Sequence, residues 1–319
     1  MGIVAALSPS LVEQYIREKE IPLRNRTSPA ETVSDVFRYG AVTVTRIQRH
    51  DRLERGMDHA WSLIREYEND NRSFPSGLVI VANRLTDGRG RFKRFWFAPE
   101  GGLWMTVVLV NTLLPVSSGL YTLATGAAAG EAIREEYSGA RVKWVNDVHA
   151  GGRKICGILT ETRRGPVSGE EYILLGIGIN VNNEEFPPEL EGLAVSLKQL
   201  LGREVDIDRL AVRFLAKLAW NIGLLHFEEN RLLAESGADS LTDPDEFASL
   251  PGSRNHLLVE NWLSLSDTLG RRVLFGYDVQ REPMFEGVAE GLGAAGNLLI
   301  RLPDGNLVSR NSGEIIYLD

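Results

Sequence analysis

Cysteine, histidine and long apolar runs are scarce in this sequence. The single cysteine, Cys156, excludes an intramolecular disulfide and a metal cluster of cysteine ligands, and its apolar neighbours indicate a small buried side chain. The five histidines show no metal-ligand spacing and are interpreted as surface or core residues; they are His50, His59, His149, His226 and His256. No stretch reaches the roughly 18 consecutive apolar residues of a membrane-spanning helix, and the N-terminus carries no signal segment. These absences predict a cytoplasmic protein with no membrane partner.

The sequence also has fewer basic than acidic residues. The 35 Lys and Arg residues are outnumbered by 43 Asp and Glu residues, which gives a net charge of −8. Such a surface repels a phosphate backbone unless a local basic patch is present, so we expect no nucleic-acid partner. The hydrophobic content of 43% is ordinary for a globular protein. The length of 319 residues exceeds what a single hydrophobic core normally supports. We therefore expect a compact unit with an appended second domain.

The first forty residues predict a short helical extension. Residues 9–19 carry apolar side chains at helical spacing after a capping serine, and residues 29–39 form a second short helix. A winged helix-turn-helix domain needs roughly sixty residues for three helices and a wing. The segment 1–40 is therefore assigned as an extension without a DNA-binding domain.

Residues 41–227 alternate between segments typical of strands and segments typical of helices. Strands are expected where β-branched and apolar residues cluster, at 41–47, 77–83, 103–110, 141–147, 154–161 and 171–181. Helices are expected at 58–68, 120–137 and 206–227. Gly151 and Gly152 mark a hairpin, and several strands follow one another with no crossover helix between them. The pattern predicts an α+β domain, with a mixed, largely antiparallel sheet flanked by helices.

The C-terminal part predicts two further units. Residues 228–264 begin with a stretch rich in Glu, Asp, Ser and Gly, which indicates a solvated surface insertion, and end in a connecting helix. Residues 265–319 contain five short alternating segments separated by turn residues, such as those at 303–305. Five short strands in so small a domain indicate a closed β-barrel of the SH3-like kind.

The segment 87–96 concentrates positive charge beside two glycines. Its cations are Arg89, Arg91, Lys93 and Arg94. Like charges at such spacing repel one another unless an anion lies among them. Gly88 and Gly90 let backbone N–H groups approach that anion, guanidinium groups bind phosphate or carboxylate oxygens in pairs, and Trp96 is placed to stack on a base. The motif indicates a phosphate site or, taken alone, an exposed basic loop.

A second motif clusters charged groups around a hairpin. Lys143, Asn146 and Asp147 lie at the end of a predicted strand, and Lys154 lies across the hairpin from them. This cluster suits a carboxylate and a metal-bound nucleotide. An ordinary strand end followed by a polar hairpin has the same residues, so the motif alone leaves both interpretations open.

A third motif places two glycines in an apolar strand. Gly176 and Gly178 alternate with isoleucines and lead to Asn180. Glycines remove side chains from one face of a strand, which is favourable where a ligand or another backbone comes close. The spacing is not a dinucleotide fingerprint, because the third glycine and the following helix are missing.

In this order and spacing the three motifs resemble the biotin protein ligase family, from about Ala41 to Asp319. The family's GRGR turn, with its following arginine and tryptophan, is matched by Gly88, Arg89, Gly90, Arg91, Arg94 and Trp96. Its Lys-Trp-Pro-Asn-Asp segment is matched by residues 143–147 with valine in place of proline, and its separate lysine by Lys154. Its glycine strand is matched by Gly176, Gly178 and Asn180.

The resemblance implies a two-step ligase that uses ATP and Mg²⁺. A small carboxylic acid first attacks the α-phosphate of ATP, and a lysine of an acceptor carrier protein then displaces AMP from the acyl-adenylate. The catalytic residues implied are Arg89, Arg91, Asp147 and Lys154. The nucleotide-binding residues implied are Gly88, Gly90, Arg94, Trp96, Lys143, Asn146, Gly176, Gly178 and Asn180. Family members often pair through the core sheet, which implies a homodimer.

The resemblance also divides the roles among these residues. Arg89 and Arg91 would order over the carboxylate and the phosphates, and Lys154 would neutralise the carboxylate and then the acyl-phosphate oxygen. Trp96 would cover the adenine, while the Asn-Asp pair at 146–147 would position the nucleotide and Mg²⁺. Fixed cations and backbone donors are the main devices of such chemistry, because both steps build negative charge on oxygens.

Two places that meet the biotin head in the family are changed here. Its Ser-Thr-Asn segment corresponds to residues 55–57 and a glutamine before the GRGR turn to Leu85, so the substrate-head pocket is assigned to Arg55 and Leu85. Each polar atom of a buried urea left unpaired costs about 1 to 3 kcal/mol. Biotin is the leading acid. The alternative is a different carboxylic acid, with Arg55 meeting a second anionic group and Leu85 an apolar one.

Two further alternatives stay open. Val145 and Lys93 stand where the family has proline and glycine, and such changes fit a regulatory relative that binds a nucleotide or adenylate without transferring it. Lipoate or octanoyl transfer on the related fold is less favoured, because proteins with that activity generally lack a GRGR turn combined with an SH3-like tail.

Overall fold

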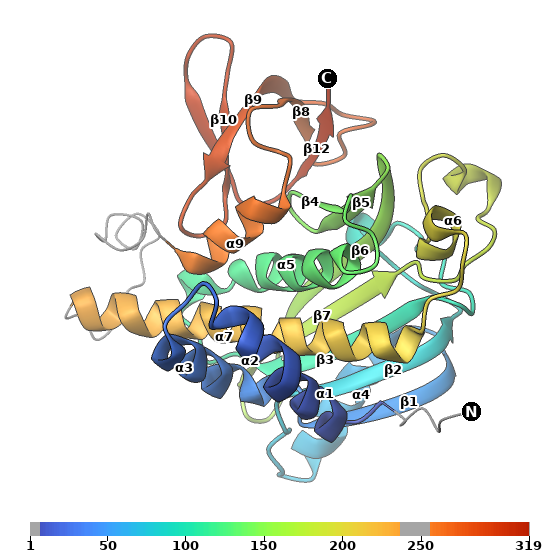
Figure 1. Cartoon of the computed structure of the whole chain (residues 1–319), viewed down its shortest axis with the longest axis vertical. Helices are drawn as coiled ribbons and strands as arrows, with labels where there is room; N and C mark the ends of the chain where they lie inside the picture. The colour runs from blue at the N-terminus through green and yellow to red at the C-terminus, as the bar shows by residue number, and fades with distance from the viewer. Residues whose placement is uncertain (1–6, 237–255, 319) are drawn as a thin grey trace.

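The computed structural model describes residues 7–236 and 256–318, in which a helix-flanked sheet is joined to a smaller C-terminal sheet (Figure 1). The first helix, α1 (Pro9–Tyr15), begins after Ser8, whose hydroxyl accepts a hydrogen bond from the Leu11 N–H. A π-helical turn, η1 (Ile16–Glu20), and α2 (Ile21–Arg24) continue it, and α3 (Ala30–Gly40) follows. Both helices expected in the first forty residues are therefore present.

A seven-stranded sheet forms the centre of the main domain. In spatial order its strands are β1 (Arg46–Leu53), β2 (Leu78–Leu85), β3 (Leu103–Val110), β7 (Glu171–Ile179), β6 (Arg153–Arg164), β5 (Asp147–Ala150) and β4 (Arg141–Lys143). β1 and β2 pair in parallel, and the other neighbours pair in antiparallel fashion. The predicted mixed, largely antiparallel sheet is confirmed.

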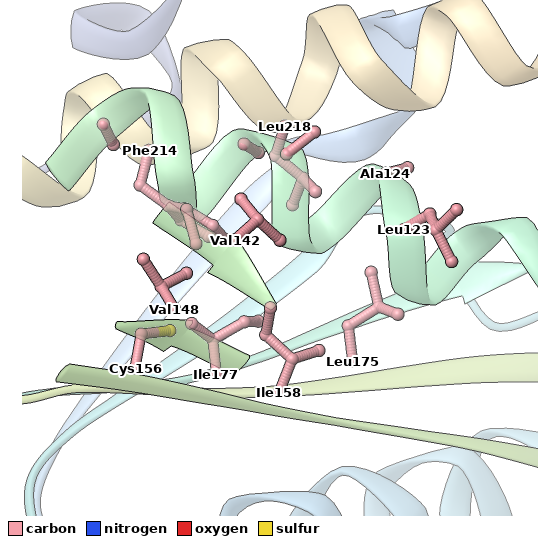
Figure 2. Close-up of a cluster of buried hydrophobic side chains, with 14 of the residues drawn as sticks. Leu123, Ala124, Val142, Val148, Cys156, Ile158, Leu175, Ile177, Phe214 and Leu218 are labelled. Atoms are coloured by element: carbon pink, nitrogen blue, oxygen red, sulfur yellow. The ribbon is translucent and has the colours of Figure 1, made fainter. Parts of the chain in front are cut away.

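Helices cover both faces of this sheet (Figure 1). α4 (Gly56–Asn69) packs on one face through Met57, Ala60 and Ile64. On the other face α5 (Leu120–Arg134) lies against β6, and α7 (Ile207–Ser236) covers α5. Figure 2 shows the interior of this layer, in which side chains of α5, the sheet and α7 meet; those labelled include Leu123, Ile158, Leu175, Phe214 and Leu218. Cys156 is buried in the same layer, as expected.

α7 is the longest helix of the described residues. Its segment Ile207–Ala234 is long and apolar enough to cross a membrane by length and composition, but 89% of its most apolar window is buried inside the protein, as in a core helix. The fully buried alanines 127–129 of α5 allow close packing against it. Shorter elements are η2 (Ala41–Thr43), η3 (Arg91–Lys93), η4 (Pro115–Ser117), η5 (Pro188–Leu190) and α6 (Leu197–Leu201).

Two predicted strands differ from the structure. Residues 41–43 form the 3₁₀ turn η2, and the first strand begins only at Arg46. β1 lies at the sheet edge and carries mostly polar side chains, none of them fully buried, so β-branched content did not mark it. The single strand expected at 141–147 is two short strands, β4 and β5, separated by residues 144–146, whose Trp144–Val145 peptide bond is cis. The glycine hairpin at 151–152 therefore joins β5 to β6.

The start of the predicted surface insertion is helical and partly buried. α7 continues to Ser236, and Glu228 and Glu229 are 0% and 5% exposed. The Glu229 carboxylate accepts hydrogen bonds from the Ser117 hydroxyl at 2.5 Å and the Leu114 N–H at 3.0 Å, so the solvated loop predicted from these acids is wrong at this point. Residues 237–255, the remainder of that segment before the connecting helix, lie outside the described residues.

The C-terminal domain contains the five strands expected from the sequence. After α9 (Leu257–Leu265) come β8 (Arg272–Gly276), β9 (Phe285–Leu292), β10 (Leu298–Arg301), β11 (Leu307–Arg310) and β12 (Glu314–Tyr317). They form an antiparallel sheet in the order β11-β10-β9-β8-β12. Trp144 joins this sheet to the main domain, because its indole N–H donates to the Gly296 carbonyl at 3.2 Å and its ring lies 6.4 Å from that of Phe275.

A buried ion network fastens the N-terminal helices to α5 and α7. The Lys217 ammonium, 3% exposed, lies 2.9 Å from a Glu20 oxygen, 2.8 Å from Glu135 and 3.8 Å from Glu131. The Arg24 guanidinium pairs with Glu131 and, at 3.1 Å, with Glu20. Burial alone would raise the pKa of Glu131, but Arg24 and Lys217 hold it below its ordinary value. The N-terminal helices are therefore fixed to the main domain by buried charge.

Candidate functional site

A cavity of about 460 Å³ opens where four segments meet. These are the glycine-rich loop (residues 87–96), the β5–β6 hairpin, the loop before α6 and the C-terminal sheet. Apart from Gly88, all the residues that the sequence assigned to a site line it: Arg55, Leu85, Arg89, Gly90, Arg91, Arg94, Trp96, Lys143, Asn146, Asp147, Lys154, Gly176, Gly178 and Asn180. Motifs far apart in the sequence therefore share one space.

The lining of this cavity is positive although the chain is negative. Six Lys or Arg side chains line it against two carboxylates, Asp147 and Glu314, whereas the whole chain carries a net charge of −8. A concave site with one sign of charge focuses the field and raises the local concentration of the opposite charge. The cavity is therefore suited to a polyanion.

Two arginines of the glycine-rich loop, residues 87–96, are held in different ways. Arg91 is half-buried, donates to the Gly313 carbonyl at 2.8 Å and approaches the Asn146 side-chain oxygen at 3.5 Å. Burial lowers the pKa of the Arg91 guanidinium, which remains charged and gains from an anion beside it. Arg89 is exposed and pairs with Asp87. Arg91 is thus held against the C-terminal domain, while Arg89, which also lines the cavity, is paired with Asp87 at the protein surface.

Arg94 connects the glycine-rich loop to the C-terminal sheet. Its guanidinium donates to both oxygens of Glu314, at 2.6 and 3.1 Å, and to Asp278 at 2.9 Å. Glu314 is the first residue of β12, and Asp278 lies in the turn after β8. A phosphate that binds Arg94 must therefore compete with two carboxylates of the protein.

The backbone of the glycine-rich loop explains why Gly88 does not line the cavity. The Trp96 N–H donates to the Gly88 carbonyl at 2.8 Å, and a Cβ at Gly88 would lie 2.4 Å from the Trp96 carbonyl oxygen. Gly88 therefore lets the two ends of the loop close on each other. Phe92 and Lys93 have φ of 55° and 58°, the left-handed region that costs non-glycine residues energy.

Trp96 lies over the glycines of the central strands. A methyl group at Gly178 would lie 2.5 Å from the indole Nε1, and one at Gly157 would lie 2.9 Å from the ring. Gly157 and Gly178 pair across β6 and β7. The indole N–H is buried and has no hydrogen-bond partner among the described residues. The glycine strand thus makes room for Trp96, whose ring forms one wall of the cavity.

Lys154 and Asp147 form an ion pair inside the cavity. The Lys154 ammonium lies 2.6 Å from Asp147 Oδ1 and 5.3 Å from the centre of the Trp96 ring. Burial alone would raise the pKa of Asp147, but Lys154, with a smaller effect of His149, holds it well below its usual range. Lys143 lies 4.9 Å from the Tyr317 ring, and burial lowers its pKa. Asp147 is therefore ionised at neutral pH and keeps Lys154 in place.

The described residues do not form a metal site of their own. They contain no group of three or more His, Cys, Asp or Glu side chains that could hold a metal ion. Asp147, which the sequence linked to Mg²⁺, is paired with Lys154. A divalent ion at this place would therefore depend on ligands that a substrate brings.

Two of the three residues assigned to the glycine strand have structural partners. A Cβ at Gly176 would lie 2.8 Å from Met57 Sδ, so this glycine makes room for α4. Asn180 is 2% exposed, and its side-chain oxygen accepts a hydrogen bond from Asn183 at 3.2 Å. Both residues touch the cavity while holding its floor in shape.

The charge of Arg55 is already balanced inside the protein. Its guanidinium pairs with Glu161 and, at 3.1 Å, with Asp58, and the side chain is 13% exposed. Leu85 ends β2 and lines the same cavity. Both residues assigned to the substrate head therefore lie at the site, Arg55 with its charge compensated.

Several cavity residues were not marked by the sequence. Gly313 and Glu314 belong to the C-terminal domain, as does Asp278, which contacts the lining residue Arg94, and the sequence around them matched no known site motif. Gly157 was signalled only as a glycine within an apolar strand. His149 lines the cavity, with Nε2 4.0 Å from Asp147, although its spacing matched no motif.

Comparisons with known proteins agree with this geometry. Residues 63–180 match the model of the biotin/lipoate A/B protein ligase family, and residues 268–317 match that of the biotin protein ligase C-terminal domain. The biotin--[acetyl-CoA-carboxylase] ligase of Mycobacterium tuberculosis is 32% identical over 186 residues, which cover 56% of this chain and 67% of that protein. The bifunctional ligase/repressor BirA of Bacillus subtilis is 38% identical over 149 residues, 44% of each chain, so this chain matches less than half of that relative's length.

A solved structure has a similar fold. The biotin protein ligase of Aquifex aeolicus in complex with biotin and ATP superposes with a TM-score of 0.62, over 86% of this chain and 98% of that one. At 23% identity this likeness concerns the fold alone.

Proposed function

This chain belongs to the biotin protein ligase family, and on that premise we propose that it is an ATP-dependent ligase. It adenylates a small carboxylic acid and transfers the acyl group to a lysine of an acceptor carrier protein. The observation that carries the proposal is the convergence of six cations and Trp96 on one cavity. Biotin is the first acid to test, because relatives of this chain are named as biotin ligases.

In the first step, an oxygen of the acid's carboxylate attacks the α-phosphorus of ATP. The bond from that phosphorus to the bridging oxygen breaks, and pyrophosphate leaves with the electron pair. Arg91 and Lys154 offset the negative charge on the reacting oxygens, since fixed cations in a water-poor site are effective there. Arg94 exchanges its carboxylate partners for the outer phosphates, and Trp96 packs beside the base.

In the second step, the neutral amine of the acceptor lysine attacks the acyl carbon. The bond from that carbon to the phosphate oxygen breaks, AMP leaves, and the proton of the amine passes to water. Lys154 remains beside the departing phosphate oxygen. No side-chain nucleophile is needed, because the mixed anhydride is already activated.

We propose that Mg²⁺ enters with the phosphates of ATP and is not bound by the protein alone. The lack of a three-ligand group in the described residues and the pairing of Asp147 with Lys154 support this division. By family resemblance the proposal also includes a homodimer formed at the core sheet, where β1 is an edge strand, and a cytoplasmic location.

The proposal is tested by ATP–pyrophosphate exchange and by mass spectrometry of an acceptor. Exchange that depends on an added carboxylic acid, followed by acylation of one acceptor lysine, is the expected result. Exchange without transfer to any carrier protein would instead favour the regulatory relative that binds an adenylate. Absence of exchange with every acid tested, from a folded sample, would refute the ligase.

Replacing Gly178 by alanine is expected to raise the KM for ATP by about tenfold. The new methyl group would lie 2.5 Å from the Trp96 indole, so the ring must leave its place over the glycine strand. Exchange kinetics at varied ATP measure the effect. Gly291→Ala is the matched control, because a Cβ there meets nothing within 4 Å; equal KM values for the two variants would contradict the role of Trp96.

Replacing Glu314 by glutamine is expected to lower the KM for ATP by two- to fivefold. The change removes one of the two carboxylates that compete with phosphate for Arg94 while keeping the side chain's size. The effect is modest because the pair is partly exposed and screened by solvent. The decrease in KM should be smaller at high salt. A rise in KM would mean that Glu314 positions Arg94 for the nucleotide and does not compete with it.

A further inference from the structure

One end of the cavity is apolar. This head end is lined by Gly56, Met57, Leu85, Trp104, Met105 and Thr106. Five of these six residues, all but Met57, also enclose a recess of about 10 Å³, so they lie together. Met57 packs against Gly176 of the cavity floor. The head end thus combines two methionines, a leucine and a tryptophan around one space.

Its side chains offer few hydrogen bonds. The Trp104 indole N–H donates to the Pro99 carbonyl at 2.7 Å, and so is not available to a ligand. The nearby Arg55 guanidinium pairs with Glu161 and Asp58, so its charge is already compensated. Among the five side chains of the head end, the Thr106 hydroxyl is the remaining polar group. A polar ring placed here would lose water and regain few partners.

We propose that the head end selects a carboxylic acid with an apolar body and disfavours one that ends in a polar ring. This inference rests on the proposed function and names the substrate class of the same site. Methionine side chains are flexible and polarisable, and they adapt to apolar ligands of varied shape. A cyclic urea, as in biotin, brings two N–H donors and one carbonyl acceptor that all need partners. An alkyl or phenyl body needs none.

Two acids of matched length test the preference. Biotin and 5-phenylpentanoic acid share a five-carbon acid chain, which ends in biotin on a fused bicycle containing a cyclic urea and in the other acid on an apolar phenyl ring. The kcat/KM for ATP–pyrophosphate exchange is expected to be at least tenfold higher with 5-phenylpentanoic acid. Isothermal titration of each acid, without ATP, is expected to give the same order of Kd.

A variant with an added polar group at the head end should shift the preference between the two acids. Leu85→Gln places an amide at the head end, and the ratio of kcat/KM between the two acids is expected to shift at least tenfold toward biotin. Leu307→Gln is the matched control, because Leu307 is exposed on the C-terminal sheet outside the cavity lining. It should leave the ratio unchanged.

The outcomes separate the inference from the function. Tighter binding of the phenyl acid without exchange would support the inference and refute the ligase. Exchange with biotin as efficient as with the phenyl acid, and unaffected by Leu85→Gln, would overturn the inference and leave the ligase standing. Failure of both acids to bind would overturn the inference as well.

Discussion

Replacing Lys154 by glutamine is expected to lower the kcat/KM of ATP–pyrophosphate exchange by about 100- to 1000-fold. The Lys154 ammonium faces the cavity, 2.6 Å from Asp147 and 5.3 Å from the centre of the Trp96 ring. It is therefore placed to neutralise a carboxylate and phosphate oxygens that approach each other. Glutamine keeps hydrogen-bonding capacity and much of the length but removes the charge, so the loss measures electrostatic stabilisation.

Lys198→Gln is the matched control for this change. Like Lys154, Lys198 forms ion pairs, in its case with Glu184 and Glu204, but it lies outside the cavity lining. Its variant should exchange at the wild-type rate. Lys154→Arg should recover part of the activity, because the charge returns in a different shape. If Lys154→Gln exchanged within a few-fold of wild type, the amine would have only a structural role beside Asp147.

The variant also has a pH consequence through Asp147. In the wild type, Lys154 is the largest influence that lowers the pKa of this carboxyl against burial. Without the ammonium, burial has more weight and the pKa rises. The stability contributed by ionised Asp147 is present above its unfolded pKa and lost as pH falls, so the variant should lose stability at a higher pH than the wild type. Acid unfolding followed by circular dichroism measures the difference.

The sequence predicted that Lys154 lies near Asp147, though not that the two form an ion pair, because only a short hairpin separates them along the chain. A hairpin with two glycines between short strands leaves few arrangements, and the residues on either side of it must meet. The contact between Arg94 and Glu314 was not predictable in this way. Those residues are 220 positions apart, and the packing of the C-terminal sheet on the main domain decides which of its many acids faces the loop.

The strands also differ in how far local sequence determines them. β3 was predicted to the residue, since a central strand buried on both faces is a continuous apolar run. β1 was misplaced, since an edge strand carries mostly polar side chains and its position is set by pairing with β2. The head end of the cavity likewise depends on packing, because Met57, Leu85 and Met105 come from three different elements.

The buried ion network gives the second large effect. Replacing Lys217 by methionine is expected to lower the free energy of unfolding by about 3 to 5 kcal/mol at neutral pH, because the buried Glu20 and Glu131 carboxylates then keep only Arg24 as a cation among the described residues. Lys217 is 3% exposed and contacts Glu20, Glu131 and Glu135. Methionine fills the same volume, so the loss reflects charge and not a cavity. Denaturant unfolding at pH 7 measures it, and Lys198→Met, at an exposed pair, should change stability little.

The pH dependence of this loss distinguishes charge from packing. The pKa of Glu131 is held below its ordinary value of 4.5 by Arg24 and Lys217, so its contribution is present above that pH and disappears as the carboxyl is protonated. The raised pKa of Lys217 places its own titration on the alkaline side, where it does not interfere. The difference in unfolding free energy between wild type and Lys217→Met should therefore shrink as pH falls below about 4.5. A difference that stays constant as the pH falls well below 4.5 would show that Lys217 stabilises the fold by packing, and that the N-terminal helices are not fastened by charge.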